Sequence, residues 1–242
     1  LTLLFLAITT LVHAQIEEAI GRFPFDETIS YDSSIPSPAE YLGYRLGEQY
    51  TFHYQIMDYF RLLGERSDKI TVHEYARTYE GRDLNYAVIT SAENQNKIEE
   101  IRNANLKIAN NPENATIGEQ PVVVWMSYNV HGNEPSSSEA AMQAAYRLVA
   151  ASDPDTEKWL DNAVVIIDPM INPDGRDRYI YWYKSSQANI LNTNVEDLEH
   201  DEIWPGGRTN HYWFDLNRDW VWLVHPESRG RITAYQQWMP QV

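Results

Sequence analysis

The spacing of hydrophobic residues differs from one segment of the chain to the next, and each spacing predicts a helix or a strand. Ahead of Gly64 they recur with the 3.6-residue period of a helix, at Ile56, Met57, Phe60 and Leu63. Residues 70–91 predict two short strands joined by a turn at residues 80–82. Ser91 is suited to cap a charged helix that runs to about residue 110. The first half of the chain therefore predicts helices and strands in alternation.

Two later stretches, residues 118–130 and residues 162–170, each contain a continuous apolar run, Val-Val-Val-Trp-Met and Ala-Val-Val-Ile-Ile. Such runs are typical of strands that are buried on both faces of a sheet. A helix at residues 135–151 separates them, and Pro135 stands at the first helical position, where proline is favoured. Strands that alternate with helices predict an α/β fold, a three-layer αβα domain around a mixed, mostly buried central sheet.

Polar and turn-forming residues are frequent in the last third of the chain. Residues 171–179 predict a turn, with the sequence Asn-Pro-Asp-Gly as its signal. The polar stretch at residues 182–213 is long for a loop, which indicates a functional insertion or the wall of a site. Residues 212–220 predict a short strand that runs into a turn. A helix then starts at about residue 225, and we expect the end of the chain to cut it off.

The N-terminal residues predict export. An apolar stretch is followed by Val-His-Ala, a pattern typical of a signal peptidase site, so residues 1–14 predict a signal peptide. Residues 15–50 predict an extended lead, rich in proline and serine, laid over the domain that residues 51–242 form. The chain has no cysteine, and export without disulfides favours a bacterial periplasm or exterior. Because an initiator Met and a basic leader region are missing, we expect a fragment of a secreted or periplasmic bacterial protein.

Composition narrows the class of protein. At 242 residues with 43% hydrophobic content, the chain is long enough to bury a sizeable core. Its formal net charge is −16, from 35 acidic and 19 basic residues, which argues against nucleic acid or an anionic membrane as the main partner. The N-terminal apolar stretch is too short to span a membrane. We expect a monomer without a membrane span.

A histidine and a carboxylate lie where the strand predicted at residues 118–130 ends. Binding sites of open α/β sheets gather at the carboxyl ends of strands, and His131 and Glu134 fall at that place. A histidine and a carboxylate belong to the ligand set of a catalytic zinc ion, which takes three protein ligands and keeps one position open. On spacing alone the zinc signal is weak, and the favoured interpretation is that His131 caps the strand and Glu134 lies near a helix start, where negative charge is favourable.

A second pair lies further on, in the sequence Phe-Asp-Leu-Asn-Arg-Asp-Trp. Asn217 and Arg218 stand side by side between apolar residues. The planar guanidinium fork of arginine binds a carboxylate through two hydrogen bonds, and an adjacent amide can add a third. The pair therefore suits an anion site, although a purely structural role is open.

Together, the motifs HGNE, NPDGR and DLNRDW, with TYEGRDL upstream, resemble the zinc carboxypeptidases of the carboxypeptidase A type over residues 56–238. The resemblance implies the fold of that family, in incomplete form. It implies that His131 and Glu134 are the first two ligands of Zn²⁺. It also implies that Asn217 and Arg218 grip the terminal carboxylate of a peptide substrate, and that Arg208 stabilises the oxyanion that forms as water attacks.

The resemblance implies an exported zinc-dependent carboxypeptidase, in which the metal polarises the scissile carbonyl and activates water. The family also needs a third histidine ligand and a glutamate base, which we expect beyond Val242. His225 and Glu227 instead predict the first turn of a helix. With two ligands, the chain as given is expected to bind zinc poorly and to be inactive.

Two other functions fit the same motifs. A zinc hydrolase that acts on cell-wall peptides or other acyl-linked amino acids would use the same clamp for the carboxylate. A non-catalytic binding protein on the same fold would keep the motifs without the chemistry.

Overall fold

The computed structural model describes residues 29–115, 118, 120–190 and 192–242. One sheet contains the strands β1 (Ile70–Arg77), β2 (Asp83–Ile89), β3 (Val122–Ser127) and β4 (Ala163–Asp168). The α-helices are α2 (Pro38–Leu42), α3 (His53–Arg66), α4 (Ala92–Asn96), α5 (Ile98–Asn110), α6 (Ser136–Ala150), α7 (Pro154–Asn162), α8 (Pro173–Ser186) and α9 (Pro226–Trp238). Single turns of 3-10 helix are η2 (Pro112–Asn114), η3 (Leu198–His200) and η4 (Leu216–Arg218). The predicted signal peptide lies outside the described residues.

The sheet is mixed, as predicted. Its strand order is β1-β2-β4-β3, in which β1 and β2 are antiparallel, β2 and β4 are antiparallel, and β3 and β4 are parallel. The helices α6 and α7 lie between β3 and β4 in the chain, as a parallel pair requires a crossover connection. The carboxyl ends of β3 and β4 therefore meet at one edge of the sheet, where Ser127 pairs with Asp168.

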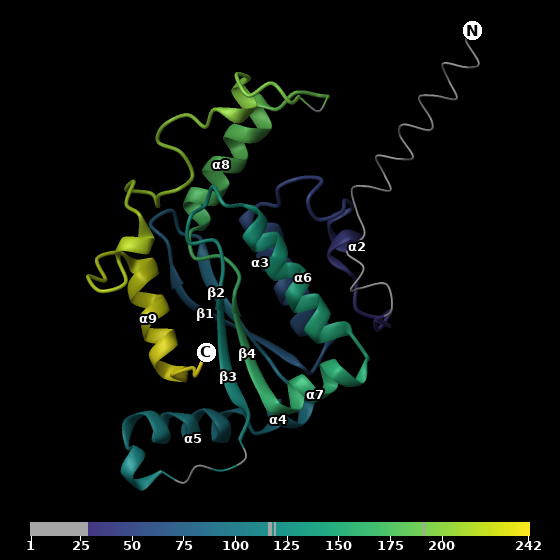
Figure 1. Ribbon diagram of the computed structural model, residues 1–242, viewed down its shortest axis with the longest axis vertical. Helices are drawn as coiled ribbons and strands as arrows, with labels where there is room; N and C mark the ends of the chain where they lie inside the picture. The colour runs from purple at the N-terminus through teal and green to yellow at the C-terminus, as the bar shows by residue number, and fades with distance from the viewer. Residues whose placement is uncertain (1–28, 116–117, 119, 191) are drawn as a thin grey trace, which may run out of the picture.

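Helices cover both faces of the sheet, which confirms the three-layer architecture (Figure 1). Successive residues of a strand point to opposite faces. In β2, Ala87 and Ile89 pack with α3 and α6, whereas Tyr86 and Val88 pack with α5 and α9. The sheet thus divides the core into two clusters, and burial of these apolar side chains is the main stabilising contribution to the fold.

The two apolar stretches form strands of unequal burial. β4 is central and buried along most of its length, as expected. β3 lies at the edge, and Val122 is 38% exposed, so the prediction that this strand is buried on both faces is wrong. Residues that follow α9 pair with its outer edge. Gln241 N donates to Val123 O at 2.9 Å, and Trp125 N donates to Val242 O at 2.8 Å. The helix α9 ends at Trp238, so the end of the chain does not cut it off.

Three other local predictions were wrong. Residues 171–179 do not form a turn but begin α8, because the Asn172 side chain caps the helix by accepting from Gly175 N, and Pro173 occupies the first turn. As a consequence, the irregular segment begins after Ser186. Residues 212–220 contain η4 instead of a strand. The helix predicted up to residue 110 is divided at Lys97 into α4 and α5.

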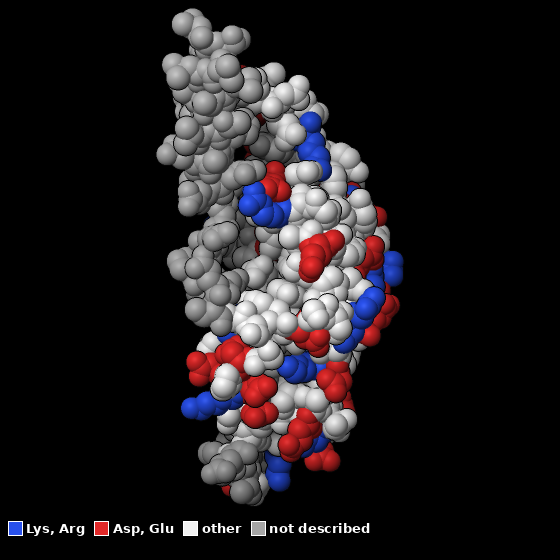
Figure 2. All heavy atoms as spheres, turned by 90° about the vertical axis from the view of Figure 1, so that its right-hand side faces the viewer, with Lys and Arg blue, Asp and Glu red and all other residues white. Residues whose placement is uncertain are grey.

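Charged side chains of both signs are interspersed on the face shown in Figure 2. Among the described residues, no helix has the length and apolar character that crossing a membrane requires.

Candidate functional site

The loop that carries the HGNE motif follows β3 directly, and one buried residue fixes its shape. Asn129 adopts a left-handed backbone conformation with φ of 55° and is 3% exposed. Its side-chain amide donates to His131 O at 2.7 Å and to Glu134 O at 3.1 Å. Asparagine tolerates this conformation better than most residues. The two candidate ligands are therefore held by the backbone before any ligand binds.

A buried arginine stabilises the same loop through hydrogen bonds. Arg176, the arginine of NPDGR, has no exposed surface. Its guanidinium donates to Asn129 Oδ1 at 3.3 Å, to Pro135 O at 2.6 Å and to Glu139 Oε1 at 2.8 Å, and Nε donates to Thr51 O at 3.0 Å. These bonds hold both flanks of the loop against α8.

His131 lies between two carboxylates. Its Nδ1 is 2.9 Å from Glu134 Oε1, and its Nε2 is 3.0 Å from Asp215 Oδ1. Because an ionised carboxylate only accepts hydrogen bonds, Nε2 carries a proton that it donates to Asp215. The lone pair of Nδ1 then faces Glu134, and two acceptors at this separation require a cation between them, either a proton or a metal ion. The donor set of imidazole nitrogen and carboxylate oxygen suits zinc.

The carboxylate of Asp215 connects His131 with Arg208. Arg208 Nη2 donates to Asp215 Oδ2 at 3.0 Å, and Asn217 N donates to Asp215 Oδ1 at 2.9 Å. Partial burial raises the pKa of Asp215, but the hydrogen bonds from Asn217 and His131 and the charge of Arg208 outweigh it, so the pKa lies below its ordinary value. Asp215 is thus ionised near neutral pH.

Asn217 and Arg218 lie in η4, two and three residues after Asp215, and both are exposed. The Asn217 side chain accepts a hydrogen bond from Trp220 Nε1 at 3.1 Å. The Arg218 guanidinium donates to Asn217 O at 3.2 Å. No carboxylate in the described part of the chain forms an ion pair with Arg218, so its charge is open to an external anion.

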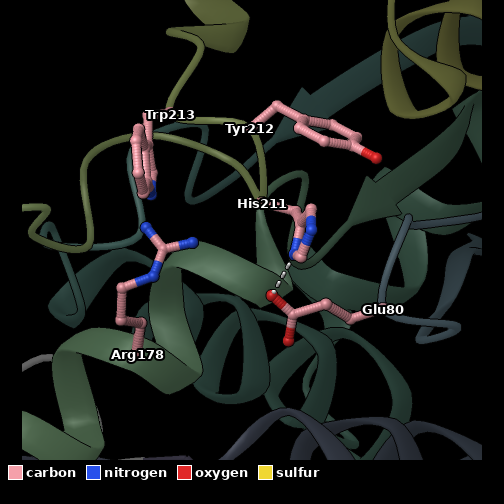
Figure 3. A pocket seen from close by; sticks show the side chains of 5 residues that line it. All are labelled: Glu80, Arg178, His211, Tyr212 and Trp213. Atoms are coloured by element: carbon pink, nitrogen blue, oxygen red, sulfur yellow. Dashed lines mark hydrogen bonds and ion pairs between the residues drawn. The ribbon is translucent and has the colours of Figure 1, made fainter.

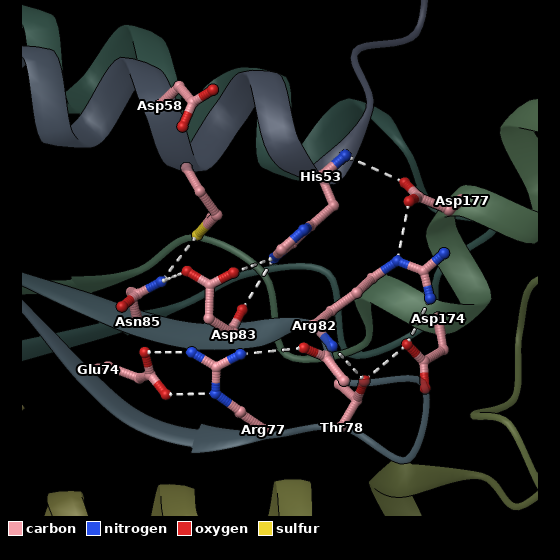
Figure 4. Close-up of polar contacts among 12 residues, drawn as sticks. His53, Asp58, Glu74, Arg77, Thr78, Arg82, Asp83, Asn85, Asp174 and Asp177 are labelled. Carbon is pink, nitrogen blue, oxygen red and sulfur yellow. Dashed lines mark hydrogen bonds and ion pairs between the residues drawn. The ribbon is translucent and has the colours of Figure 1, made fainter.

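The sequence motifs TYEGRDL and NPDGR meet in one polar network (Figure 4). Arg82 donates to Asp174 at 2.8 Å and to Asp177 at 3.0 Å. Thr78 also donates to Asp174, and His53 N donates to Asp177. The turn between β1 and β2 and the start of α3 are therefore tied to the first turns of α8. These contacts anchor the start of α8, the helix that contains Arg176.

A separate pocket of about 450 Å³ lies beside the segment that leads to Asp215. It is lined by Glu80, Arg178, His211, Tyr212 and Trp213 (Figure 3). His211 Nδ1 is 3.1 Å from Glu80 Oε1, and the Arg178 guanidinium points toward Trp213. None of the five predicted site residues lines this pocket.

The described residues contain no cluster of three or more His, Cys, Asp or Glu side chains that suits a metal ion. His225 is the N-cap residue of α9, as predicted, and is 6% exposed. Its Nδ1 is 3.1 Å from Asn210 Nδ2, and its ring packs against Phe214 and Tyr79. It takes no part in the group around His131.

The structure thus brings four predicted residues to one place, since His131, Glu134, Arg208 and the Asn217 backbone are linked through Asp215. Arg218 adjoins this group through the hydrogen bond that its guanidinium donates to Asn217 O. Sequence reasoning missed Asp215, Asn129 and Arg176. Asp215 had a signal, its place in the DLNR motif, but the partner it binds is revealed only by the fold.

Comparison with known proteins agrees with these motifs. The model of the zinc carboxypeptidase family matches residues 56–238, the extent that the motifs predicted. Carboxypeptidase D of Homo sapiens is 30% identical over 124 residues, which cover 50% of this chain and 9% of that protein. Carboxypeptidase D of Anas platyrhynchos is 28% identical over 182 residues, 71% of this chain and 12% of that protein. This chain therefore spans a small part of the length of these curated relatives.

Among solved structures, a metallo-carboxypeptidase from Burkholderia cenocepacia matches with a TM-score of 0.49 and 19% identity, over 78% of this chain and 38% of that chain. The family model covers most of the chain, including every motif described above. The chain belongs to the zinc carboxypeptidase family.

Proposed function

We propose that the protein is a zinc-dependent carboxypeptidase that hydrolyses the last peptide bond of peptides with a free C-terminus. The observation that carries this proposal is the position of His131 between Glu134 and Asp215, with Arg208 on the far side of the same aspartate. Membership of the zinc carboxypeptidase family supports it.

In this proposal, His131 Nδ1 and Glu134 supply two of the protein ligands of zinc. Asp215 accepts a hydrogen bond from His131 Nε2 and so keeps the Nδ1 lone pair directed at the metal position, as carboxylates that hydrogen-bond a ligating histidine do in zinc sites. When bound, zinc supplies polarisation of the scissile carbonyl and lowers the pKa of a bound water. Among the described residues, no cluster of three or more His, Cys, Asp or Glu side chains supplies a complete set of metal ligands.

Arg208 is the residue we assign to the oxyanion. Its side chain is 47% exposed and forms an ion pair only 3.0 Å long with Asp215, which lies against His131. A guanidinium at this place stabilises negative charge that develops on the carbonyl oxygen. Arg176 is excluded from this role, because it is fully buried and its donors are used within the protein.

Asn217 and Arg218 form the proposed clamp for the substrate's terminal carboxylate. Arg218 is exposed, and its charge has no acidic partner among the described residues. A guanidinium binds a carboxylate through two parallel hydrogen bonds, which fixes orientation as well as affinity. The clamp would set the last residue of a peptide beside the metal position and exclude substrates without a free carboxylate.

We further propose that the protein is exported and acts outside the cytoplasm, on the basis of the signal-like sequence at residues 1–14. Peptides, including those of cell walls, are the substrate class that the clamp supports.

The test compares N-blocked peptides that have a free C-terminus with the same peptides C-amidated, using the full protein loaded with zinc. We expect release of the last residue from the free acids alone, and loss of that release with a chelator. Equal rates on amidated peptides would contradict the clamp, and activity insensitive to chelator would contradict the role of zinc.

A further inference from the structure

One carboxylate connects the loop of the candidate ligands with the segment that carries Arg208. Glu202 Oε2 accepts from Asn133 Nδ2 at 2.8 Å, and Glu202 Oε1 accepts from Gly207 N. Asn133 lies between His131 and Glu134, and Gly207 directly precedes Arg208. We propose that Glu202 is a positioning residue, which sets Arg208 in register with the ligand loop. This inference rests on the proposed function.

Three glycines allow these segments to touch through their backbones. A Cβ atom on Gly132 would lie 2.5 Å from Gly207 O, and one on Gly207 would lie 2.6 Å from Gly175 O. Real Cβ atoms essentially never approach other atoms so closely. The HGNE, NPDGR and Gly-Gly-Arg segments thus pack at one junction, where any side chain would force them apart.

The backbone around Arg208 is held from several sides. Asn172 Nδ2 donates to Arg208 O at 3.1 Å. The Arg178 guanidinium donates to Gly206 O at 2.7 Å, to Asn210 O at 3.0 Å and to Thr209 O at 3.3 Å. Both of these side chains belong to the start of α8 and therefore hold the segment to the scaffold. Glu202 differs from them because its second oxygen binds the ligand loop itself.

The chemistry of this bridge suits positioning. Both Glu202 oxygens receive a hydrogen bond from an uncharged donor, and hydrogen bonds to an ionised acceptor are stronger and more directional than neutral ones. Asn133 and Glu202 are 69 residues apart in sequence, so their contact fixes a distance that local structure does not. A shift of Arg208 by about 1 Å would be costly, since misplacement of this size reduces turnover by about 100-fold.

The first experiment uses the full protein loaded with zinc and measures steady-state kinetics of Glu202→Ala on a peptide with a free C-terminus. We expect kcat to fall about 10- to 100-fold, with KM changed less than about threefold, because the clamp at Asn217 and Arg218 is untouched. Zinc content should stay at the wild-type level. Glu196→Ala, an exposed glutamate of the same segment, is the matched control and should keep wild-type kinetics.

Two further variants separate positioning from a general structural role. Glu202→Gln should retain most of the activity, because its amide can accept from Gly207 and, once the Asn133 amide turns over, donate to Asn133 Oδ1. The double variant Glu202→Ala/Arg208→Ala should be no slower than Arg208→Ala alone, since Glu202 acts through Arg208. Wild-type kcat in Glu202→Ala, or additive losses in the double variant, would overturn the proposal.

Hydrogen exchange of the Gly207 amide gives a readout that does not depend on activity. In Glu202→Ala this amide should exchange faster, with no change in the buried strand β4. If wild-type protein releases no C-terminal residue, the proposed function fails. The bridge is then judged by exchange alone: faster exchange at Gly207 supports it, and unchanged exchange overturns it.

Discussion

His131 and Asp215 are 84 residues apart in sequence, yet His131 Nε2 lies 3.0 Å from Asp215 Oδ1. This contact fixes the imidazole ring between two acidic groups and determines which of its nitrogens is free to bind a metal ion. The same aspartate binds Arg208, so one side chain aligns two residues that the sequence motifs predicted separately.

Replacement of Asp215 should weaken zinc binding without removing a direct ligand. In Asp215→Ala we expect zinc affinity to fall about 10- to 100-fold, because the His131 ring loses the acceptor that orients it. Both variants are made in the full protein, where His131→Ala should abolish stoichiometric zinc. Metal content after dialysis against a weak chelator measures both effects, and Asp201→Asn, an exposed change on the preceding segment, is the control. Unaltered affinity in Asp215→Ala would remove its proposed role.

Arg218 should determine the preference for a free carboxylate. Hydrogen bonds to charged groups contribute about 1.5–3 kcal/mol, so Arg218→Ala should raise KM for free-acid peptides about 10- to 100-fold. The variant should also lose discrimination between free-acid and amidated peptides. Arg229→Ala, an exposed arginine near the start of α9, is a suitable control. A variant that still prefers free acids strongly would place the clamp elsewhere.

Arg176 should matter for stability more than any exposed arginine does. Arg176→Met leaves Glu139 buried without its partner, and breaking such a pair costs about 3–5 kcal/mol of the free energy of unfolding. Arg45→Ala removes an exposed ion pair and should cost less than about 1 kcal/mol. Denaturant unfolding measures both. The double variant Arg176→Met/Glu139→Leu should recover part of the loss, because it leaves no unpaired buried charge.

Stability should decrease as pH rises from about 4 to 7. Burial raises the pKa of Asp168 to about 7 from 3.8, and burial also raises the pKa of Glu227 to about 7 from 4.5. The folded protein therefore keeps these protons while the unfolded chain has lost them, so the stabilisation present at low pH disappears as pH passes about 7. Thermal unfolding of wild type between pH 5 and 8 should show a lower Tm at high pH.

The double variant Asp168→Asn/Glu227→Gln is neutral at both positions throughout this range. Its Tm should therefore vary less with pH than that of the wild type, by about 3 °C or more between pH 5 and 8. An identical pH dependence in the two proteins would show that these two carboxyl groups do not remain protonated in the folded state.

Periodicity predicts those parts of the fold in which the order of apolar and polar residues within one segment determines which side chains are buried. The run at residues 163–168 predicts a buried strand because every position is apolar until Asp168, and β4 is that strand. The Asn-Pro-Asp-Gly signal was misleading, because the same residues favour both turns and the first turn of a helix. The helix forms here because Asn172 caps it, and Arg82 and Thr78 bind Asp174 from a distant turn.

The candidate site divides in the same way. His131 and Glu134 are visible from their spacing and from the strand before them. Asp215 lies in the DLNR motif, but its partner His131 is 84 residues away, so the sequence does not reveal the contact. Asn133 and Glu202 have no such signal for their pairing, and their importance comes from a contact across 69 residues. Asn129 is distinguished by its left-handed backbone conformation, which cannot be read from the sequence.

The long spacing of these contacts also bears on the order in which the molecule folds. Loop closure over many residues is entropically unfavourable, so contacts between distant segments form after local helices and hairpins. The bond between His131 and Asp215 joins the loop that follows β3 to the residue that precedes η4, and α8 lies between them in the chain. On the proposed function, the imidazole that would bind zinc therefore takes its orientation late during folding, after the local helices and hairpins.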